Sequence, residues 1–88
     1  MESKLRNNES GDEFWMLPNG DFHKEDGPAV VYLDGDKEWW INGKLHRENS
    51  PAVELNNGDE DWWLNGFEYS ESEHKAEVRR RKLKNILL

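Results

Sequence analysis

Two histidines are the residues of this chain best suited to chemistry. His23 and His46 are each followed by a basic residue and then a glutamate. A histidine beside carboxylates could act as a general base or bind a metal ion. The two are 23 residues apart, and if each such unit adds two strands they lie roughly 10 Å from one another, too far to share a metal ion. We therefore predict structural histidines, each hydrogen-bonded to a turn carbonyl.

No other pattern predicts a catalytic or cofactor site. The chain has no cysteine, which excludes disulfides, thiolate metal sites and thiol catalysis. It also lacks a phosphate-binding glycine loop, a dinucleotide-binding pattern and a nucleophile elbow. Asp34-Gly35-Asp36 resembles the start of a calcium loop, but the later ligands are absent, so we interpret it as a turn. We expect a protein that is not an enzyme, with no catalytic residue, cofactor or metal ion.

A 23-residue repeat dominates the middle of the chain. Residues 39–43 (WWING) return as 62–66 (WWLNG), and residues 28–30 (PAV) return as 51–53. A fixed period of this length indicates an array in which each unit buries its apolar face on the next. We predict a mainly β fold, an antiparallel β-hairpin meander of about 2.5 repeats, over residues 13–69.

Segments of different character flank the array. Residues 1–12 are polar and without periodicity, so we predict a flexible lead-in. Residues 70–88 predict an α-helix that caps the open end of the array, because Ser70 and Glu73 match a capping box. The helix carries a basic run toward its C-terminal end, where the helix dipole favours cations; the run comprises Arg79, Arg80, Arg81, Lys82 and Lys84.

The turns predict a register. Asn-Gly and Asp-Gly dipeptides favour two-residue type I′ loops. With such a loop at residues 34–35, Val30 faces Trp39, and the same construction places Val53 opposite Trp62. We call the resulting surface the core face; it is predicted to carry Val30, Tyr32, Trp39, Ile41, Val53, Leu55, Trp62 and Leu64.

The opposite face is predicted to hold an apolar stripe in an acidic field. Trp40 faces Leu45 across the Asn-Gly turn between them, Leu17 faces Phe22 across another, and Trp63 is the third equivalent. If the C-terminal helix or sheet curvature covers the stripe, it belongs to the core. If it stays open, it marks a partner site, and the acids that would meet a basic partner are Asp36, Glu38, Asp59 and Asp61.

Charge is strongly segregated along the chain. Residues 1–74 hold 6 Lys and Arg against 18 Asp and Glu, whereas residues 75–88 hold 6 against 1. The acidic part argues against a nucleic-acid surface on the sheet and suits a protein partner with a basic surface, although solubility alone would also explain it. The basic run is open to three interpretations: a helix end that clamps the acidic sheet, a nucleic-acid contact, or a surface for a partner or a second copy.

The repeats resemble a variant of the MORN-type repeat family, and more closely those of uncharacterised bacterial, phage and large-virus proteins. Their pattern is roughly W-W/Y-x-N-G-x-x-H-R-x-x-G-P-A; residues 39–47 match the first part and residues 23–29 the second. The likeness covers about residues 14–69. It departs at Ser50, where glycine is expected, and at residues 67–69. The resemblance implies an antiparallel hairpin array that binds something, and no activity.

Together these patterns predict a small acidic protein-binding module of phage or bacterial origin. It would act in the cytoplasm, as a monomer or weak homodimer, by occluding or recruiting a host protein. Two alternatives remain: a nucleic-acid-associated protein that uses the basic helix, and a self-assembling structural repeat protein that extends its sheet through an open edge. No apolar run reaches the length of a membrane span, so we expect no membrane association.

Overall fold

Nine short strands precede one helix in this computed structural model, which describes residues 3–87 and the side chains of residues 3–84. Met1, Glu2 and Leu88, which belong to the two predicted flanking segments, lie outside the described residues. The elements are β1 Lys4–Asn7, β2 Glu13–Met16, β3 Val30–Val31, β4 Lys37–Glu38, β5 Trp40–Ile41, β6 Lys44–Leu45, β7 Val53–Glu54, β8 Glu60–Leu64, β9 Phe67–Tyr69 and α1 Glu71–Leu87.

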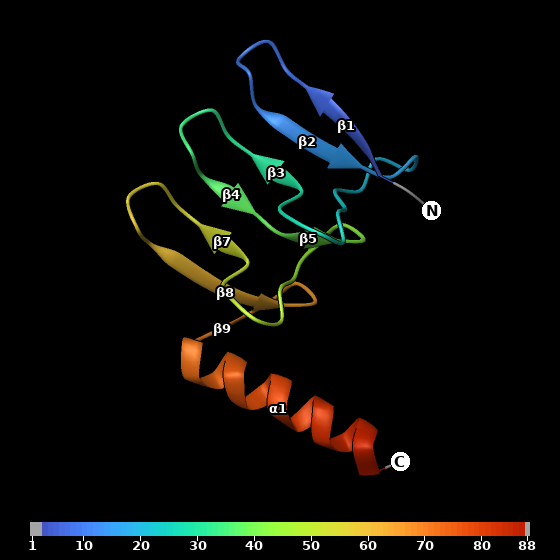
Figure 1. Ribbon diagram of the computed structural model, residues 1–88, viewed down its shortest axis with the longest axis vertical. Helices are drawn as coiled ribbons and strands as arrows, with labels where there is room; N and C mark the ends of the chain where they lie inside the picture. The colour runs from blue at the N-terminus through green and yellow to red at the C-terminus, as the bar shows by residue number, and fades with distance from the viewer. Residues whose placement is uncertain (1–2, 88) are drawn as a thin grey trace.

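The strands form an antiparallel meander. Seven of them make one sheet in the order β1-β2-β3-β4-β7-β8-β9, and β5 pairs with β6 in a short side hairpin. The hairpins β1-β2, β3-β4 and β7-β8 follow one another like rungs, and α1 lies past the last of them (Figure 1). The prediction of a mainly β hairpin meander with a C-terminal helix is confirmed.

The molecule is a thin slab of 47 × 33 × 17 Å. The thickness leaves little room for a helix, about 10 Å across, on top of a sheet. The helix α1 instead packs beside the sheet, against β8 and β9 (Figure 1). Consequently α1 closes one end of the meander and leaves most of both sheet faces without a second layer.

Two kinds of turn join the strands. Asn42-Gly43 and Asn65-Gly66 are two-residue loops with positive φ at both residues, because asparagine tolerates the left-handed region and glycine has no side chain to clash. The loop at Gly35 is different: only the glycine has positive φ, and Tyr32 exchanges hydrogen bonds with Asp36 and Gly35. That pattern is a three-residue loop, in which a type I turn ends in a left-handed glycine.

The extra loop residue shifts the predicted register. Val30 pairs with Glu38 rather than Trp39, and Val53 pairs with Asp61 rather than Trp62. A one-residue shift moves a side chain to the other face of a sheet. The predicted core face is therefore wrong: the buried Val30 and Val53 share a face with Trp40 and Trp63, whereas the opposite face carries Trp39, Ile41, Trp62 and Leu64.

The turn at Asn19-Gly20 shows the same shift. Leu17 exchanges hydrogen bonds with Asp21 and Gly20, and Phe22 forms its bridge with Met16. The predicted pairing of Leu17 with Phe22 is wrong. The same three-residue loop forms at Gly35 and Gly58, where the first loop residue is not a proline, so Pro18 is not required for it.

The predicted flexible lead-in contains a strand. β1 pairs with β2 in the register Lys4↔Met16 to Asn7↔Glu13, although every residue of β1 is exposed. The prediction for residues 1–12 is therefore wrong for this segment. The strand β1 forms because it pairs with β2, and the polar composition of residues 1–12 does not reveal that pairing.

The helix begins where the capping box predicts. Ser70 N donates to Glu73 Oε1 over 3.0 Å, and Glu73 N donates to Ser70 Oγ over 3.2 Å. These reciprocal bonds satisfy backbone donors that a helix start leaves free. They also hold the pKa of the Glu73 carboxyl below its ordinary value. Val78 is buried and anchors α1 toward the sheet.

Candidate functional site

An aromatic strip crosses the sheet face that carries Val30 and Val53. Phe14 stacks on Phe22 with ring centroids 5.7 Å apart, and Phe22 meets the edge of Trp40 at 5.3 Å. All three side chains are half-buried. We call these residues, together with Leu45 and Trp63 on the same face, the aromatic strip; it draws side chains from three rungs of the meander.

A carboxylate holds the centre of the strip in place. Trp40 Nε1 donates to Glu38 Oε1 over 2.8 Å, and the Tyr32 hydroxyl donates to Glu38 Oε2 over 3.4 Å. Burial and the neighbouring Glu38 carboxylate raise the pKa of Tyr32, so the phenol stays protonated and remains a donor. The Trp40 ring is thus held in one orientation on this face of the sheet.

The equivalent position in the next rung lacks this hydrogen bond. Trp63 is 23 residues after Trp40, and Asp61 is 23 residues after Glu38. The Trp63 Nε1 is buried and finds no hydrogen-bond partner among the described residues. Since aspartate is one methylene shorter than glutamate, its carboxylate does not reach the indole.

Most of the predicted site residues do share one face. The register places Phe22, Trp40, Leu45 and Trp63 together, all half-buried, and α1 does not lie over them. The register moves Leu17 to the opposite face, whereas Phe14, which was not predicted, belongs to the strip.

The four predicted acids have different environments. Asp36 Oδ1 accepts a 2.7 Å hydrogen bond from Asn56 N in the neighbouring rung, and Glu38 binds Trp40. These two carboxylates therefore serve the fold. Asp59 is exposed, and Asp61 is half-buried on the strip face.

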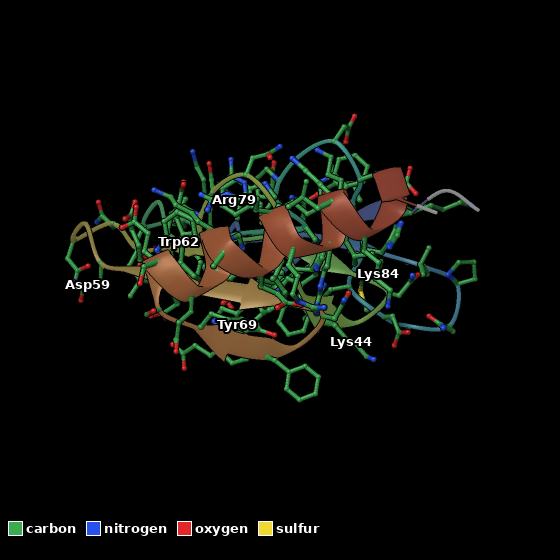
Figure 2. All side chains as sticks on the ribbon, turned by 90° about the horizontal axis from the view of Figure 1, so that it is seen from below. Lys44, Asp59, Trp62, Tyr69, Arg79 and Lys84 are labelled. Atoms are coloured by element: carbon green, nitrogen blue, oxygen red, sulfur yellow. The ribbon has the colours of Figure 1, made fainter. Side chains whose placement is uncertain are left out.

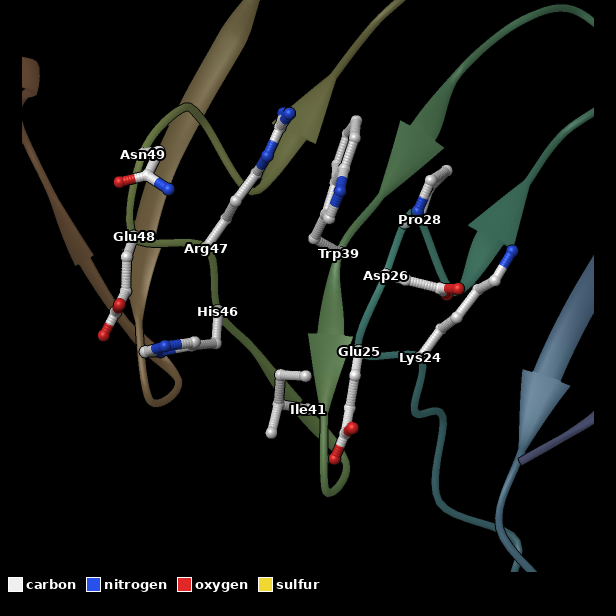
Figure 3. Close-up of a pocket in the computed structure, with 11 residues that line it drawn as sticks. Lys24, Glu25, Asp26, Pro28, Trp39, Ile41, His46, Arg47, Glu48 and Asn49 are labelled. Carbon is white, nitrogen blue, oxygen red and sulfur yellow. The ribbon is translucent and has the colours of Figure 1, made fainter. Parts of the chain in front are cut away.

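A groove of about 630 Å³ lies between two equivalent loops, 24–28 and 46–49 (Figure 3). It is on the face opposite the strip, and Trp39 and Ile41 form part of its wall. The Arg47 guanidinium lies 3.7 Å from the centre of the Trp39 ring and binds Glu54 Oε2 at 3.0 Å. Its lining mixes both charge signs. The groove was not predicted, although the repeat spacing of the two loops was a signal for it.

Cations cover one tryptophan in each rung. Lys24 Nζ lies 4.2 Å from the centre of the Trp15 ring, as Arg47 does over Trp39. At the end of the meander Lys75 of α1 takes this position over Trp62, at 5.6 Å. The helix thus replaces the loop that another rung would supply.

The histidines hold turns. His23 Nδ1 accepts a 3.0 Å hydrogen bond from Asn42 N, and His46 Nδ1 accepts one of the same length from Asn65 N. The predicted structural role fits this geometry, but the partner is a turn amide rather than the predicted carbonyl. Burial lowers the pKa of His46, which keeps Nδ1 free to accept.

No structural or chemical role was predicted for the third histidine, His74. His74 is completely buried in α1; its Nε2 lies 2.6 Å from the Arg47 carbonyl oxygen and its ring meets Trp62 at 4.9 Å. These contacts bind the helix to the last rung. The sequence placed His74 only near the start of the predicted helix, and that position does not predict its burial or its contacts.

The basic run divides into two groups. Arg80 and Arg81 both pair with Glu77 of their own helix, at 2.6 and 2.9 Å, and lower the pKa of that carboxyl to about 2. Arg79, Lys82 and Lys84 are exposed. Among the side chains of residues 3–84, no ion pair joins the basic run to the sheet, so the suggested clamp is absent there.

Within the described residues there is no cluster of three or more side chains suited to a metal ion. The described helix is also too short and too polar to span a membrane. Comparison with family models, curated proteins and solved structures finds no match to this chain. The MORN-type resemblance therefore remains a prediction from the residues quoted above.

Proposed function

We propose that this chain is a protein-binding module whose aromatic strip docks on an apolar patch of a partner. One observation carries the proposal: Phe14, Phe22 and Trp40 form a continuous aromatic surface on a face that α1 does not cover. Aromatic side chains are enriched among the residues that dominate binding energy at protein interfaces.

The fixed orientation of the Trp40 ring and the negative charge near the aromatic strip support the same proposal. The hydrogen bond from Trp40 to Glu38 fixes the ring, so little side-chain freedom is lost on binding. Asp59 and Asp61 add negative charge beside Trp63, which favours a partner with a basic rim and speeds encounter. The protein would act by occluding the partner's surface or by bringing it to another molecule.

Capture with matched variants tests this proposal. Immobilised wild type, Trp40→Ser and Phe67→Ser are incubated with lysate, and the retained proteins are compared. Phe67 is the control because its ring is 70% exposed and the register places it on the face opposite the strip. A partner retained by wild type and Phe67→Ser but lost by a folded Trp40→Ser supports the proposal. A set of retained proteins that is the same for all three variants contradicts it.

A further inference from the structure

The molecule carries opposite charges at opposite sides. The tips of the three rungs, residues 8–12, 32–36 and 55–59, line up along one side of the slab (Figure 1). These tips contain acids and no Lys or Arg. In Figure 2, Asp59 lies at one end of the view, Lys84 of α1 lies beyond the centre on the other side, and Arg79 lies between them. Among the side chains of residues 3–84, no ion pair joins the basic run to the acidic tips.

The helix presents a cationic groove. A hollow of about 380 Å³ separates α1 from the loop at Glu48 and Asn49. Its helical wall follows the spacing of one helix face, with apolar Val78 and Leu83 between cations, and comprises Lys75, Val78, Arg79, Lys82 and Leu83. Leu83 is 52% exposed, and the only carboxylate in the lining is that of Glu48. Lys75 already pairs with Glu71, but Arg79 and Lys82 make no ion pair with a described side chain.

The acidic tips present the complementary shape. Leu33 stands at the middle tip and is 75% exposed, more than any other large apolar side chain described. Glu9 and Asp59, both exposed, belong to the tips on either side of it. Adjacent rungs are about 10 Å apart, and the helix between Lys75 and Lys82 is also about 10 Å long. The groove therefore has the length of two adjacent tips, which is enough for Leu33 of the middle tip and the acids of one neighbouring tip.

We propose that copies of this chain associate head to tail, with the acidic tips of one copy in the α1 groove of the next. Leu33 packs against the exposed Leu83, and carboxylates of the middle tip and one neighbouring tip meet Arg79 and Lys82. The contact joins two different surfaces, so it leaves one free surface of each kind and continues from copy to copy. It does not involve the aromatic strip. It shares Asp59 with the function proposed above, and the groove variant described next, which leaves Asp59 unchanged, tests the association separately from that function.

Reciprocal charge reversal tests this association. One variant reverses the groove (Arg79→Glu with Lys82→Glu), and a second reverses the tips (Glu9→Lys with Asp59→Lys). Sedimentation velocity is measured from about 10 μM to about 1 mM protein in about 20 mM salt, where charge attraction is weakly screened. The wild type should gain mass with concentration, each variant should stay monomeric, and an equimolar mixture of the two should associate again.

Two controls complete the design. Lys4→Glu with Arg6→Glu makes the same change in net charge as the groove variant but on β1, and it should associate like the wild type. Leu33→Ser changes no charge and should weaken association about tenfold, because it removes the apolar contact. Circular dichroism confirms that every variant is folded.

Three results would overturn the inference: a wild type that is monomeric throughout this range, a groove variant that still associates, or a mixture that stays monomeric. A fourth such result is that a labelled DNA duplex binds to a monomeric wild type but does not bind to the groove variant. That result would assign the groove to nucleic acid instead.

Discussion

The indole Nε1 of Trp40 donates a 2.8 Å hydrogen bond to Oε1 of Glu38, whereas the Nε1 of Trp63, one rung further on, is buried and has no hydrogen-bond partner among the described residues. The two sites differ because Asp61 stands where the earlier rung has glutamate. A buried donor that lacks an acceptor destabilises a fold, whereas the same donor when paired does not. A difference of one methylene group therefore decides whether the indole N–H in each rung has a hydrogen-bond acceptor.

Asp61→Glu should consequently stabilise the protein. The longer side chain brings a carboxylate to Trp63 Nε1, and we expect the free energy of unfolding to rise by about 1 kcal/mol. Urea unfolding followed by tryptophan fluorescence measures the change. Asp59→Glu, at an exposed tip, is the control and should have little effect. A loss of stability in Asp61→Glu would show that the missing hydrogen bond has another cause.

Two glycines in identical turns should differ in their response to alanine. Gly43 and Gly66 both have positive φ in Asn-Gly turns, so each alanine variant should lose about 1–2 kcal/mol of stability from backbone strain. A side chain at Gly43 would also come within 2.9 Å of Asp21 Cγ, whereas one at Gly66 meets only Lys44, at 3.7 Å. Asn19 holds Asp21 in position through two hydrogen bonds. Gly43→Ala should therefore melt lower than Gly66→Ala, and equal melting temperatures would contradict the close approach of Asp21.

His46 should make stability depend on pH in a definite direction. Its pKa in the folded protein lies below the ordinary value of 6.5, so between the two values the unfolded chain binds more protons. The stabilisation is complete above the ordinary value and declines as the pH falls through 6.5 toward the folded pKa. His46→Asn keeps an acceptor for Asn65 N but does not titrate. Between about pH 7.5 and pH 5.5 this variant should lose less stability than the wild type, and equal losses in urea unfolding would rule out the proposed titration.

The capping box should contribute measurably to α1. Ser70→Ala removes the hydroxyl that accepts from Glu73 N, and we expect a loss of about 1 kcal/mol in the free energy of unfolding. Ser72→Ala is the matched control, because the Ser72 hydroxyl accepts no backbone hydrogen bond in the described structure. If both variants unfold alike in urea, the cap does not stabilise the helix.

The turns mark the limit of what the sequence predicts. Asn42-Gly43 forms the predicted two-residue loop, yet the similar pair Asp34-Gly35 forms a three-residue loop. Contacts from neighbouring rungs distinguish the two cases: Leu33 N donates to Asp12 Oδ1, across 21 residues of chain, and Asn56 N donates to Asp36 Oδ1 across 20. No local pattern contains such contacts, and a shift of one residue was enough to exchange the faces on which Val30 and Val53 lie.

The candidate site was predictable to the extent that it depends on single strands. Alternation placed Asp36, Glu38 and Trp40 on one side of a strand, and the Asn-Gly turn placed Leu45 opposite Trp40, as the structure has them. The contribution of Phe14 was not predictable, because it depends on how separate rungs pair. The contact of His74 with the Arg47 carbonyl, which binds α1 to the last rung, was not predictable either, because it depends on tertiary packing alone.

The affinity of the captured partner for wild type, Trp40→Ser and Phe67→Ser tests the proposed function most directly. Isothermal titration calorimetry gives each affinity, and thermal melting shows how far each variant is destabilised. The aromatic strip predicts that Trp40→Ser weakens binding by roughly 2 kcal/mol or more, the size typical of an aromatic hot spot, with a smaller loss of stability, while Phe67→Ser binds as the wild type does. If Trp40→Ser binds like the wild type but melts much lower, the strip is core and is not a binding site.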